Sequence, residues 1–422
     1  MTKGPLDGLF TEFTEAPLTE APFTEARRQL TICNACRYCE GYCAVFPALE
    51  RLSELTRGDV THLADLCHDC RDCYTACMYA PPHEFAVNVP AALSAVRRHT
   101  YDEYLPRLPW AAGPVKRRAA MFTAGLGAIL LLALLGVLAG GARAGMQGAG
   151  VPGAGAGSPY LVIAYPALLA AVGLPALWSV LVMAGSAARY WRATGGHGLT
   201  SPRALLSALR QAASLRNLRG AGAGCSYPGD EPSAARRRLH GLVAWGFACC
   251  AGSTVAAAIS QDIAGDPPPY PVLSAPVLLG VIGGAGMVIG CGGLLLLRRA
   301  AGTADAGTAD AGTAGAGSAD AASGPPREDA ALARRGYALL AGLLLLAVTG
   351  LLTLVCRDTP AFGLILAVHL AVVVACFAIA PYTKFMHVIY RFLALVHDSA
   401  AVAGNAARES GKSAGGGPRK RA

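Results

Sequence analysis

Eight cysteines near the start of the chain have a spacing that suits iron–sulfur chemistry. They form two copies of the pattern C-x2-C-x2-C-x3-C, written CNACRYCEGYC and CHDCRDCYTAC. In bacterial two-cluster ferredoxins, the fourth cysteine of each such run binds the other cluster. The spacing therefore predicts two [4Fe–4S] clusters with crossed ligands. The predicted ligands are Cys33, Cys36, Cys39 and Cys77 for cluster 1, and Cys43, Cys67, Cys70 and Cys73 for cluster 2.

The competing interpretation of these cysteines is a pair of structural zinc sites. Zinc sites usually combine C-x2-C pairs with a longer gap between the pairs, and neither run has such a gap. Ala44 and Met78 stand where a proline commonly follows the fourth cysteine, which changes the turn and leaves the number of ligands unchanged. No amino-terminal signal peptide is visible, so the dense cysteines favour metal or redox ligation over a disulfide scaffold.

Three histidines stand at or near the ends of apolar segments: His240, His369 and His387. His369 and His387 are 18 residues apart. In a continuous helix this spacing is five turns, so both side chains would share one face, separated by a rise of about 27 Å. His240 opens a segment that we expect to run antiparallel to theirs. His240 and His387 are therefore predicted to meet at one depth in the membrane as the axial ligands of a b-type haem.

His369 has no histidine opposite it, because the far end of the segment that His240 opens reads AAAISQDI. It is a candidate for a second haem, for a quinone or proton-handling site, or for a relic without a ligand. The structural alternative for all three histidines is an interfacial side chain hydrogen-bonded to backbone. The other six are expected to be ordinary surface or loop residues: His62, His68, His83, His99, His197 and His397.

The composition indicates that these side chains are positioned by membrane helices. The chain has 422 residues, of which 53% are hydrophobic and only 15% charged, with a mean hydropathy of +0.41. Such a chain is too apolar for an ordinary soluble domain, and its long apolar runs begin only at Met121. The spans predicted to cross the bilayer are 119–141, 160–184, 241–263, 271–297, 336–356 and 361–381.

The basic residues predict how these spans are oriented. The loop between the second and third spans carries nine arginines against Asp230 and Glu231, whereas the connection at 264–270 carries no Lys or Arg. By the positive-inside rule, both termini and the cysteines lie on the cytoplasmic side of a bacterial inner membrane. The net charge of +9 is explained by this topology, so no nucleic-acid partner is expected.

The expected fold is mainly α, with an N-terminal ferredoxin-like two-[4Fe–4S] module followed by a six-helix transmembrane bundle. The Thr/Glu/Pro-rich start is expected to be disordered, and so are the Ala/Gly-rich loop and the basic tail. The predicted divisions are a leader (1–28), the cysteine module (29–118), helices 1–2 (119–184), an Arg-rich loop (185–240), helices 3–4 (241–297), a low-complexity loop (298–335), helices 5–6 (336–398) and the tail (399–422).

Three segments resemble a known family: ICNACRYCEGYCAVFPALE, LCHDCRDCYTACMYAPPHEFAVNVP and APYTKFMHVIYRF. They are similar to the tricarballylate utilization protein B family (TcuB, also called CitB) and to the carboxy-terminal half of CobZ. The histidine spacing on the last span is also similar to that of the haem-carrying gamma subunit of respiratory nitrate reductase. The sequence departs from the family at Leu239 and at Ser260 and Gln261, where the family leads us to expect further histidines.

The resemblance implies a membrane electron-transfer protein with two [4Fe–4S] clusters and b-type haem. Its implied partner is an FAD-dependent dehydrogenase, TcuA, which oxidises tricarballylate, and its implied electron acceptor is the membrane quinone. The segment GAGAGS at 153–158 follows no predicted strand, so the flavin is expected on a separate chain. The alternatives are a subunit of a heterodisulfide-reductase-like or nitrate-reductase-like complex, or a haem-free iron–sulfur redox sensor or transporter.

Overall fold

The computed structural model of the chain describes residues 20–105, 158–196, 201–222, 224–226, 231–313 and 330–415. These residues form helices joined by short turns, and among them the one β-bridge outside a strand links Cys225 and Ser233. The mainly α prediction is therefore confirmed. The predicted span 119–141 lies outside the described residues.

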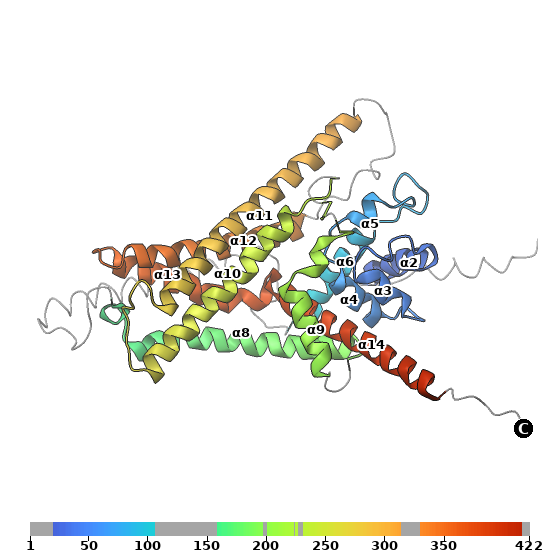
Figure 1. The fold of residues 1–422 in the computed structure, drawn as a ribbon. Helices are drawn as coiled ribbons and strands as arrows, with labels where there is room; N and C mark the ends of the chain where they lie inside the picture. The colour runs from blue at the N-terminus through green and yellow to red at the C-terminus, as the bar shows by residue number, and fades with distance from the viewer. Residues whose placement is uncertain are drawn as a thin grey trace, which may run out of the picture.

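A cysteine domain, residues 20–105, forms one end of the molecule (Figure 1). Asn88 caps the N-terminus of its last helix by accepting from the Ala91 N–H, and Thr56 and Asp59 form a capping box that starts another. The helices of the cysteine domain are α2 (Ala21–Cys36), α3 (Val45–Glu50), α4 (Arg57–Leu66), α5 (Asp72–Thr75) and α6 (Val89–Glu103).

The core of the cysteine domain begins earlier in the chain than we expected. Phe23 and Ala26 on α2 are buried against α4 and α6, although the sequence predicted a disordered leader up to residue 28. The expectation is wrong for residues 21–28. The physical reason is that these two apolar side chains extend the buried face of the helix that carries Cys33.

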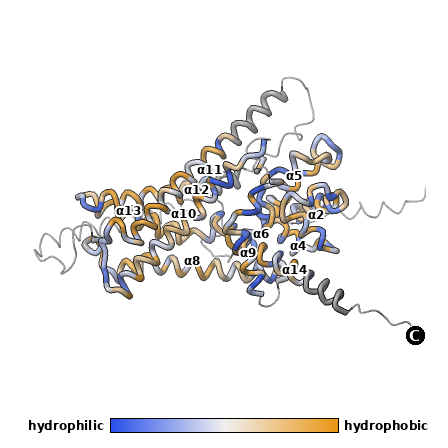
Figure 2. The backbone as a smooth tube through the Cα atoms, in the orientation of Figure 1, coloured by the Kyte–Doolittle hydropathy of each residue, from blue (hydrophilic) through white to orange (hydrophobic). Residues whose placement is uncertain are grey.

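Five helices are long and apolar enough to cross a membrane, by their length and composition. Much of their apolar surface is exposed in the structure: Leu174, for example, is 67% exposed, as expected for a helix that faces lipid. Figure 2 shows these hydrophobic helices gathered on the side away from the cysteine domain. They agree with five of the six predicted spans: 165–193, 235–263, 275–300, 336–355 and 362–382.

The spans lie in five helices. The two helices that carry Gly246 and Gly283 pack at close range. Gly246 and Gly283 face each other, and a Cβ on Gly246 would lie 2.8 Å from the Gly283 carbonyl oxygen. Small residues at this crossing let the two backbones touch, as is common in membrane bundles. The helices are α8 (Tyr165–Ala193), α10 (Ala235–Ala258) with the π turn Ile259–Ile263, α11 (Ala275–Thr313), α12 (Ala330–Val355) and α13 (Phe362–Ile379).

The last membrane helix does not continue to His387, so the expected single helix from His369 to His387 is wrong. Helix α13 ends at Ile379, two 3₁₀ turns follow, and α14 (His387–Gly415) begins at the histidine itself. Pro381 has no N–H to donate and disfavours helical geometry in the residue before it. Thr383 is extended, and its hydroxyl accepts from the Phe385 N–H at 3.1 Å.

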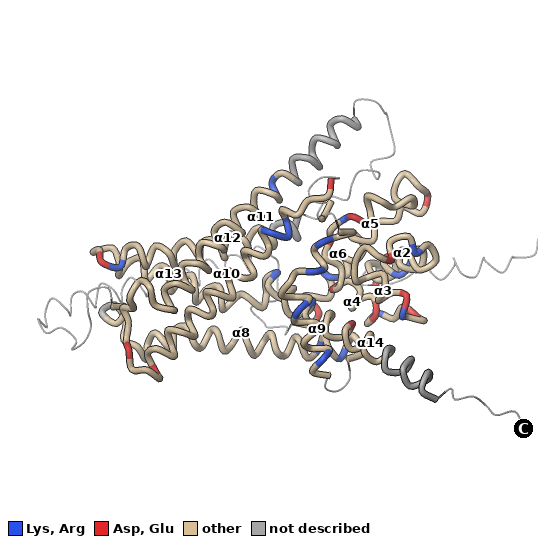
Figure 3. Tube along the Cα trace, viewed as in Figure 1, with Lys and Arg blue, Asp and Glu red and all other residues tan. Residues whose placement is uncertain are grey.

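The segments expected to be loops are partly helical. Helix α9 (Pro202–Ala213) lies in the Arg-rich segment and packs on α14, which runs far into the expected disordered tail. Helix α11 likewise reaches Thr313, inside the expected low-complexity loop. Ala208 on α9 and Leu395 near the start of α14 enter the core of the cysteine domain. Figure 3 shows Lys and Arg concentrated where the membrane helices meet this domain.

Candidate metal centre

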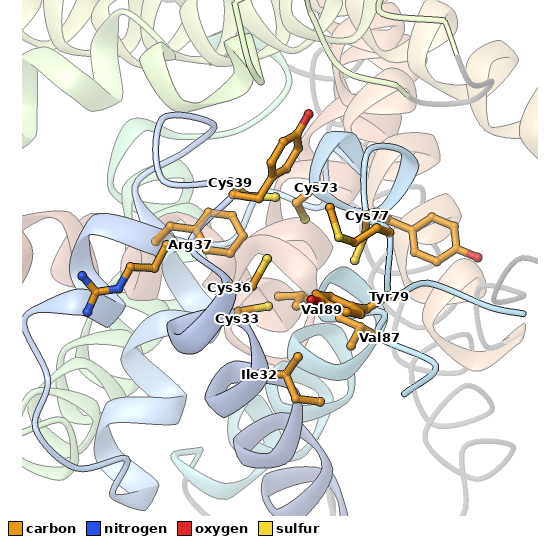
Figure 4. Close-up of a pocket in the computed structure, with 14 residues that line it drawn as sticks. Ile32, Cys33, Cys36, Arg37, Cys39, Cys73, Cys77, Tyr79, Val87 and Val89 are labelled. Atoms are coloured by element: carbon orange, nitrogen blue, oxygen red, sulfur yellow. The ribbon is translucent and has the colours of Figure 1, made fainter. Parts of the chain in front are cut away.

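Four of the predicted ligands line one pocket of the cysteine domain. Cys33, Cys36, Cys39 and Cys77, here called the Cys33 group, come from the end of α2, from the turn after it and from the end of the second cysteine run. Figure 4 shows them around the pocket together with Cys73. The structure thus brings Cys77 to the first run, as the crossed assignment requires.

The other four predicted ligands also lie near one another. The charges of Cys67, Cys43 and Cys70 act on Cys73 more strongly than that of Cys39, and Cys67 acts on Cys43 more strongly than Cys39 does. We call these four the Cys67 group. Cys73 also lines the pocket of the Cys33 group, so the two groups are adjacent. The assignment of each cysteine to a cluster stays a prediction, which this arrangement supports.

Both cysteine runs turn at the same point. Arg37 and Arg71 each follow the second cysteine of their run, and both have left-handed backbone, with φ values of 57° and 67°. A positive φ is uncommon outside glycine and asparagine. Arg37 is the C-cap of α2 and Arg71 is the N-cap of α5, so in both runs the chain changes direction between the second and third cysteines. The shared conformation indicates that the two runs build the same kind of site.

Burial makes these thiols hard to ionise unless a metal is bound. It raises the pKa of Cys33 to about 12 and that of Cys39 to about 11, and the neighbouring thiols act in the same direction. Burial also raises the pKa of Cys43 to about 12, against the backbone N–H groups of Val45 and Phe46, which favour the thiolate. Iron must therefore displace protons as it binds.

The described residues offer no compact site for a single ion. Among them, no group of three or more His, Cys, Asp or Glu side chains is close enough together to hold one metal ion. The choice between iron–sulfur clusters and zinc therefore rests on the spacing and shared turn of the two runs.

The Cys67 segment is held by arginines that the sequence analysis did not single out. Arg97 on α6 donates to the Ala64 and Cys67 carbonyl oxygens at 2.5 and 3.0 Å. Arg391 on α14 donates to the same Cys67 carbonyl at 2.8 Å. A sequence signal existed for Arg391, because it lies one helical turn after His387 and so on the same face.

A third arginine reaches this segment from the membrane helices. Arg236, four residues before His240 on α10, donates to the carbonyl oxygens of His68 and Asp69 at 3.1 and 2.5 Å. Asp72, inside the second cysteine run, is held in a different way. Its carboxylate accepts from the N–H groups of Ala221 and Ser226, both at 2.8 Å. The backbone of the second run is therefore fixed from several sides.

His240 and His387 meet where α10 and α14 begin. Their ring centroids are 6.1 Å apart, with 43° between the ring planes. A metal–imidazole bond is about 2 Å long and the ring centre lies about 1 Å behind the nitrogen, so two imidazoles on opposite sides of one iron have centres about 6 Å apart. The His387 Nδ1 faces the Lys384 carbonyl oxygen, and donation to it would leave Nε2 as the metal-binding nitrogen. The ring separation is therefore compatible with two imidazole ligands of one iron, and the assignment of this pair to a haem stays a prediction.

His369 lies on α13, away from this pair, and contacts α12. Its Nδ1 is 3.0 Å from the Thr349 hydroxyl, and a Cβ on Gly350 would lie 3.1 Å from its Cε1. The structure does not bring a second histidine to it among the described residues. At the far end of α10, Gln261 accepts from the Tyr160 hydroxyl and Asp262 from that of Tyr165.

Two histidines that we expected to be ordinary surface residues are partners in the interior. The rings of His62 on α4 and His397 on α14 are 4.6 Å apart, and His62 is 7% exposed. Burial, together with the nearby charges of His397 and Arg51, lowers the pKa of His62 to about 3. The expectation is wrong for this pair because α14 covers α4, a contact that no local pattern predicts. His197 lies outside the described residues.

Comparison with known proteins places the chain in a family. The family described as "Citrate utilization protein B Fer4-like domain" matches residues 26–103, and the family described as "Citrate utilization protein B" matches residues 112–324 and 311–409. Citrate utilization protein B of Escherichia coli is 37% identical over 385 residues, covering 90% of this chain and 93% of that protein. No solved structure matches the chain. The chain therefore belongs to the citrate utilization protein B family, with a Fer4-like N-terminal domain followed by apolar helices.

Proposed function

We propose that this chain is a membrane electron-transfer protein. It reoxidises the reduced flavin of a partner dehydrogenase and passes the electrons to quinone in the bilayer. The resemblance to the tricarballylate utilization protein B family implies an FAD-dependent, TcuA-like dehydrogenase of a tricarboxylate such as tricarballylate as the partner. The name of the Escherichia coli relative refers to the utilization of citrate, which is also a tricarboxylate. The chain itself is a relay and not the subunit that oxidises the substrate.

One observation carries this proposal: the Cys67 segment and the histidine pair are neighbours of the same two arginines, Arg236 and Arg391. Arg236 and Arg391 reach the segment that holds Cys67, and each is one helical turn from a histidine of the pair. If the Cys67 group holds a cluster and the histidine pair holds a haem, the two electron carriers would be neighbours at the boundary between the cysteine domain and the apolar helices.

The residues of the chain have separate tasks in this relay. The Cys33 and Cys67 groups would hold two [4Fe–4S] clusters, and His240 and His387 would hold a b-type haem. When bound, these groups accept and release single electrons, which a two-electron flavin donor requires. The buried faces of α4 and α6 exclude water from the Cys67 segment, and Arg97 and Asp72 fix its backbone.

The partner dehydrogenase would dock over the Cys33 group. Tyr38 and Met78 line that pocket and are 58% and 63% exposed, so this side of the cysteine domain is open. The apolar helices would lie in the bacterial inner membrane with both termini cytoplasmic. The Lys and Arg side chains near the cysteine domain support this orientation.

A reduced-minus-oxidised absorption spectrum of the purified full chain, with iron and pyridine-haemochrome quantitation, tests the proposal. We expect about eight non-haem irons, two [4Fe–4S] clusters, and sharp haem bands. Clusters without haem would restrict the chain to an iron–sulfur relay, sensor or transporter. Zinc in place of iron would overturn the proposal. A pull-down that recovers a different redox complex would point to the heterodisulfide-reductase-like or nitrate-reductase-like alternative.

A further inference from the structure

Three arginines bring positive charge to the Cys67 segment by donating to its backbone carbonyl oxygens. Arg97 and Arg391 both donate to the Cys67 carbonyl, which is neutral. The nearby carboxylate of Asp65 also accepts from the Tyr101 hydroxyl at 2.9 Å. The charges of Asp69 and Asp65 act on Arg97, and that of Asp65 also acts on Arg391.

Buried guanidinium groups need an anion close by. The charge of Cys67 is among the influences that favour the charged form of Arg97 and of Arg391. An iron–sulfur cluster held by four thiolates is a net anion, and it becomes more negative when it is reduced. The Cys67 group, once it holds iron, would add an anion next to these guanidinium groups.

The Cys33 group has different surroundings. Arg37, the arginine that lines its pocket, is exposed and donates from Nε to the Asn34 carbonyl at 3.0 Å. Tyr38 and Met78 leave the same pocket open to solvent. Solvent screens an exposed charge strongly, whereas partly buried charges are screened much less. The two cysteine groups therefore differ in the positive field that they experience.

We propose that Arg97, Arg236 and Arg391 hold the cluster at the Cys67 group at a higher reduction potential than the cluster at the Cys33 group. Positive charge favours the more negative, reduced cluster, and cluster potentials follow local charge, hydrogen bonding and exposure. This inference rests on the proposed function and adds a direction to it. Single electrons move from the Cys33 group to the Cys67 group and on to the histidine pair, with no bond made or broken. The electron donor is the partner's reduced flavin, and the acceptor is the haem iron.

A redox titration followed by electron paramagnetic resonance, on the purified full chain, tests this order. Cys36→Ser and Cys70→Ser variants identify which cluster signal belongs to which group. In Arg391→Gln, we expect the ratio of reduced to oxidised Cys67 cluster at a fixed potential to fall at least tenfold, while that of the Cys33 cluster stays the same. For one-electron couples this is a shift of about 59 mV. Arg37→Gln is the matched control and leaves the ratio unchanged.

Further variants keep the outcome decisive. Arg391→Lys keeps the positive charge and should recover most of the shift, and Arg236→Gln tests the charge from the other helix if Arg391→Gln does not fold. If both cluster signals are intact and neither potential changes in Arg391→Gln or Arg236→Gln, the inference is overturned and the proposed relay function is unaffected. An equal shift in Arg37→Gln would overturn it as well. The absence of any cluster signal from the wild-type chain would overturn the proposed function itself.

Discussion

The two ends of the apolar helices hold histidines in opposite surroundings. Next to the cysteine domain, His240 and His387 face each other from α10 and α14, with arginines one turn away on each helix. On α13, His369 faces a threonine hydroxyl and a glycine of α12. One residue type thus has a second imidazole as its neighbour in one place and a hydroxyl in the other.

The difference shows that the role of a histidine in an apolar helix follows from the side chain that it contacts and not from its depth in the membrane. Two imidazoles 6.1 Å apart across a helix junction have the separation of axial ligands. A single imidazole bonded to a hydroxyl has the geometry of a packed polar side chain, or of a ligand waiting for a partner outside the described residues. Three measurements test this contrast.

The largest effect is expected on haem content. His240→Ala and His387→Ala should each remove the haem held between them, because one imidazole cannot replace the pair. His369→Ala should retain it. Haem per protein, measured as pyridine haemochrome on chains with unchanged iron content, checks this result. Haem that is lost from His369→Ala and retained in His387→Ala would reverse the assignment of the two sites.

The second effect is a dependence of folding stability on pH, which we expect from His62 in the cysteine domain. The pKa of His62 is about 3 in the folded chain, against about 6.5 for an unperturbed histidine. Between these values the unfolded chain binds a proton that the folded chain excludes, so stability falls as the pH falls. At pH 5 the loss attributable to His62 is about 2 kcal/mol.

His62→Gln should therefore lose less stability than the wild type between pH 7 and pH 5. The comparison must be a difference between the two chains, because Asp65 acts in the opposite direction. Its raised folded pKa of about 6 means that the folded chain keeps a proton longer than the unfolded chain, so its contribution improves as the pH falls. Urea unfolding of the purified chains in detergent measures the difference. Equal pH dependence in both chains would rule out His62 as its source.

The parts of the site that the sequence predicts are those that depend on local spacing. The cysteine runs place their ligands within a few residues of one another, and helix direction alone suggests that His240 and His387 can meet. The contacts of Arg97 and Arg391 with the Cys67 carbonyl are different, because they depend on how α6 and α14 pack on a turn of the chain. The periodicity of a sequence does not indicate which backbone carbonyl accepts a hydrogen bond from an arginine far along the chain.

The errors in the predicted fold have the same physical origin. The spacing of His369 and His387 matched one continuous helix, but a single proline at 381 ends the helix between them. The Arg-rich segment reads as a polar loop, yet α9 buries Ala204 and Ala208 on one face, and Ala208 belongs to the core of the cysteine domain. Tertiary packing decides both features, and composition shows neither.

The smallest effect tests the other side of the contrast, at His369. The Thr349 hydroxyl lies 2.8 Å from the Leu345 carbonyl, to which it can donate its one proton, so it accepts from the His369 Nδ1. Thr349→Val should cost about 0.6 kcal/mol, the average for such a bond between membrane helices. It should leave haem content unchanged. Thr353→Val, one turn later on α12 and without this contact, is the matched control.

Loss of haem in Thr349→Val alone would mean that Thr349 orients His369 as a metal ligand, because removing a hydrogen-bond partner of a ligating histidine weakens metal binding. The two ends of the helices would then hold the same kind of site, and a second axial ligand would have to be sought outside the described residues.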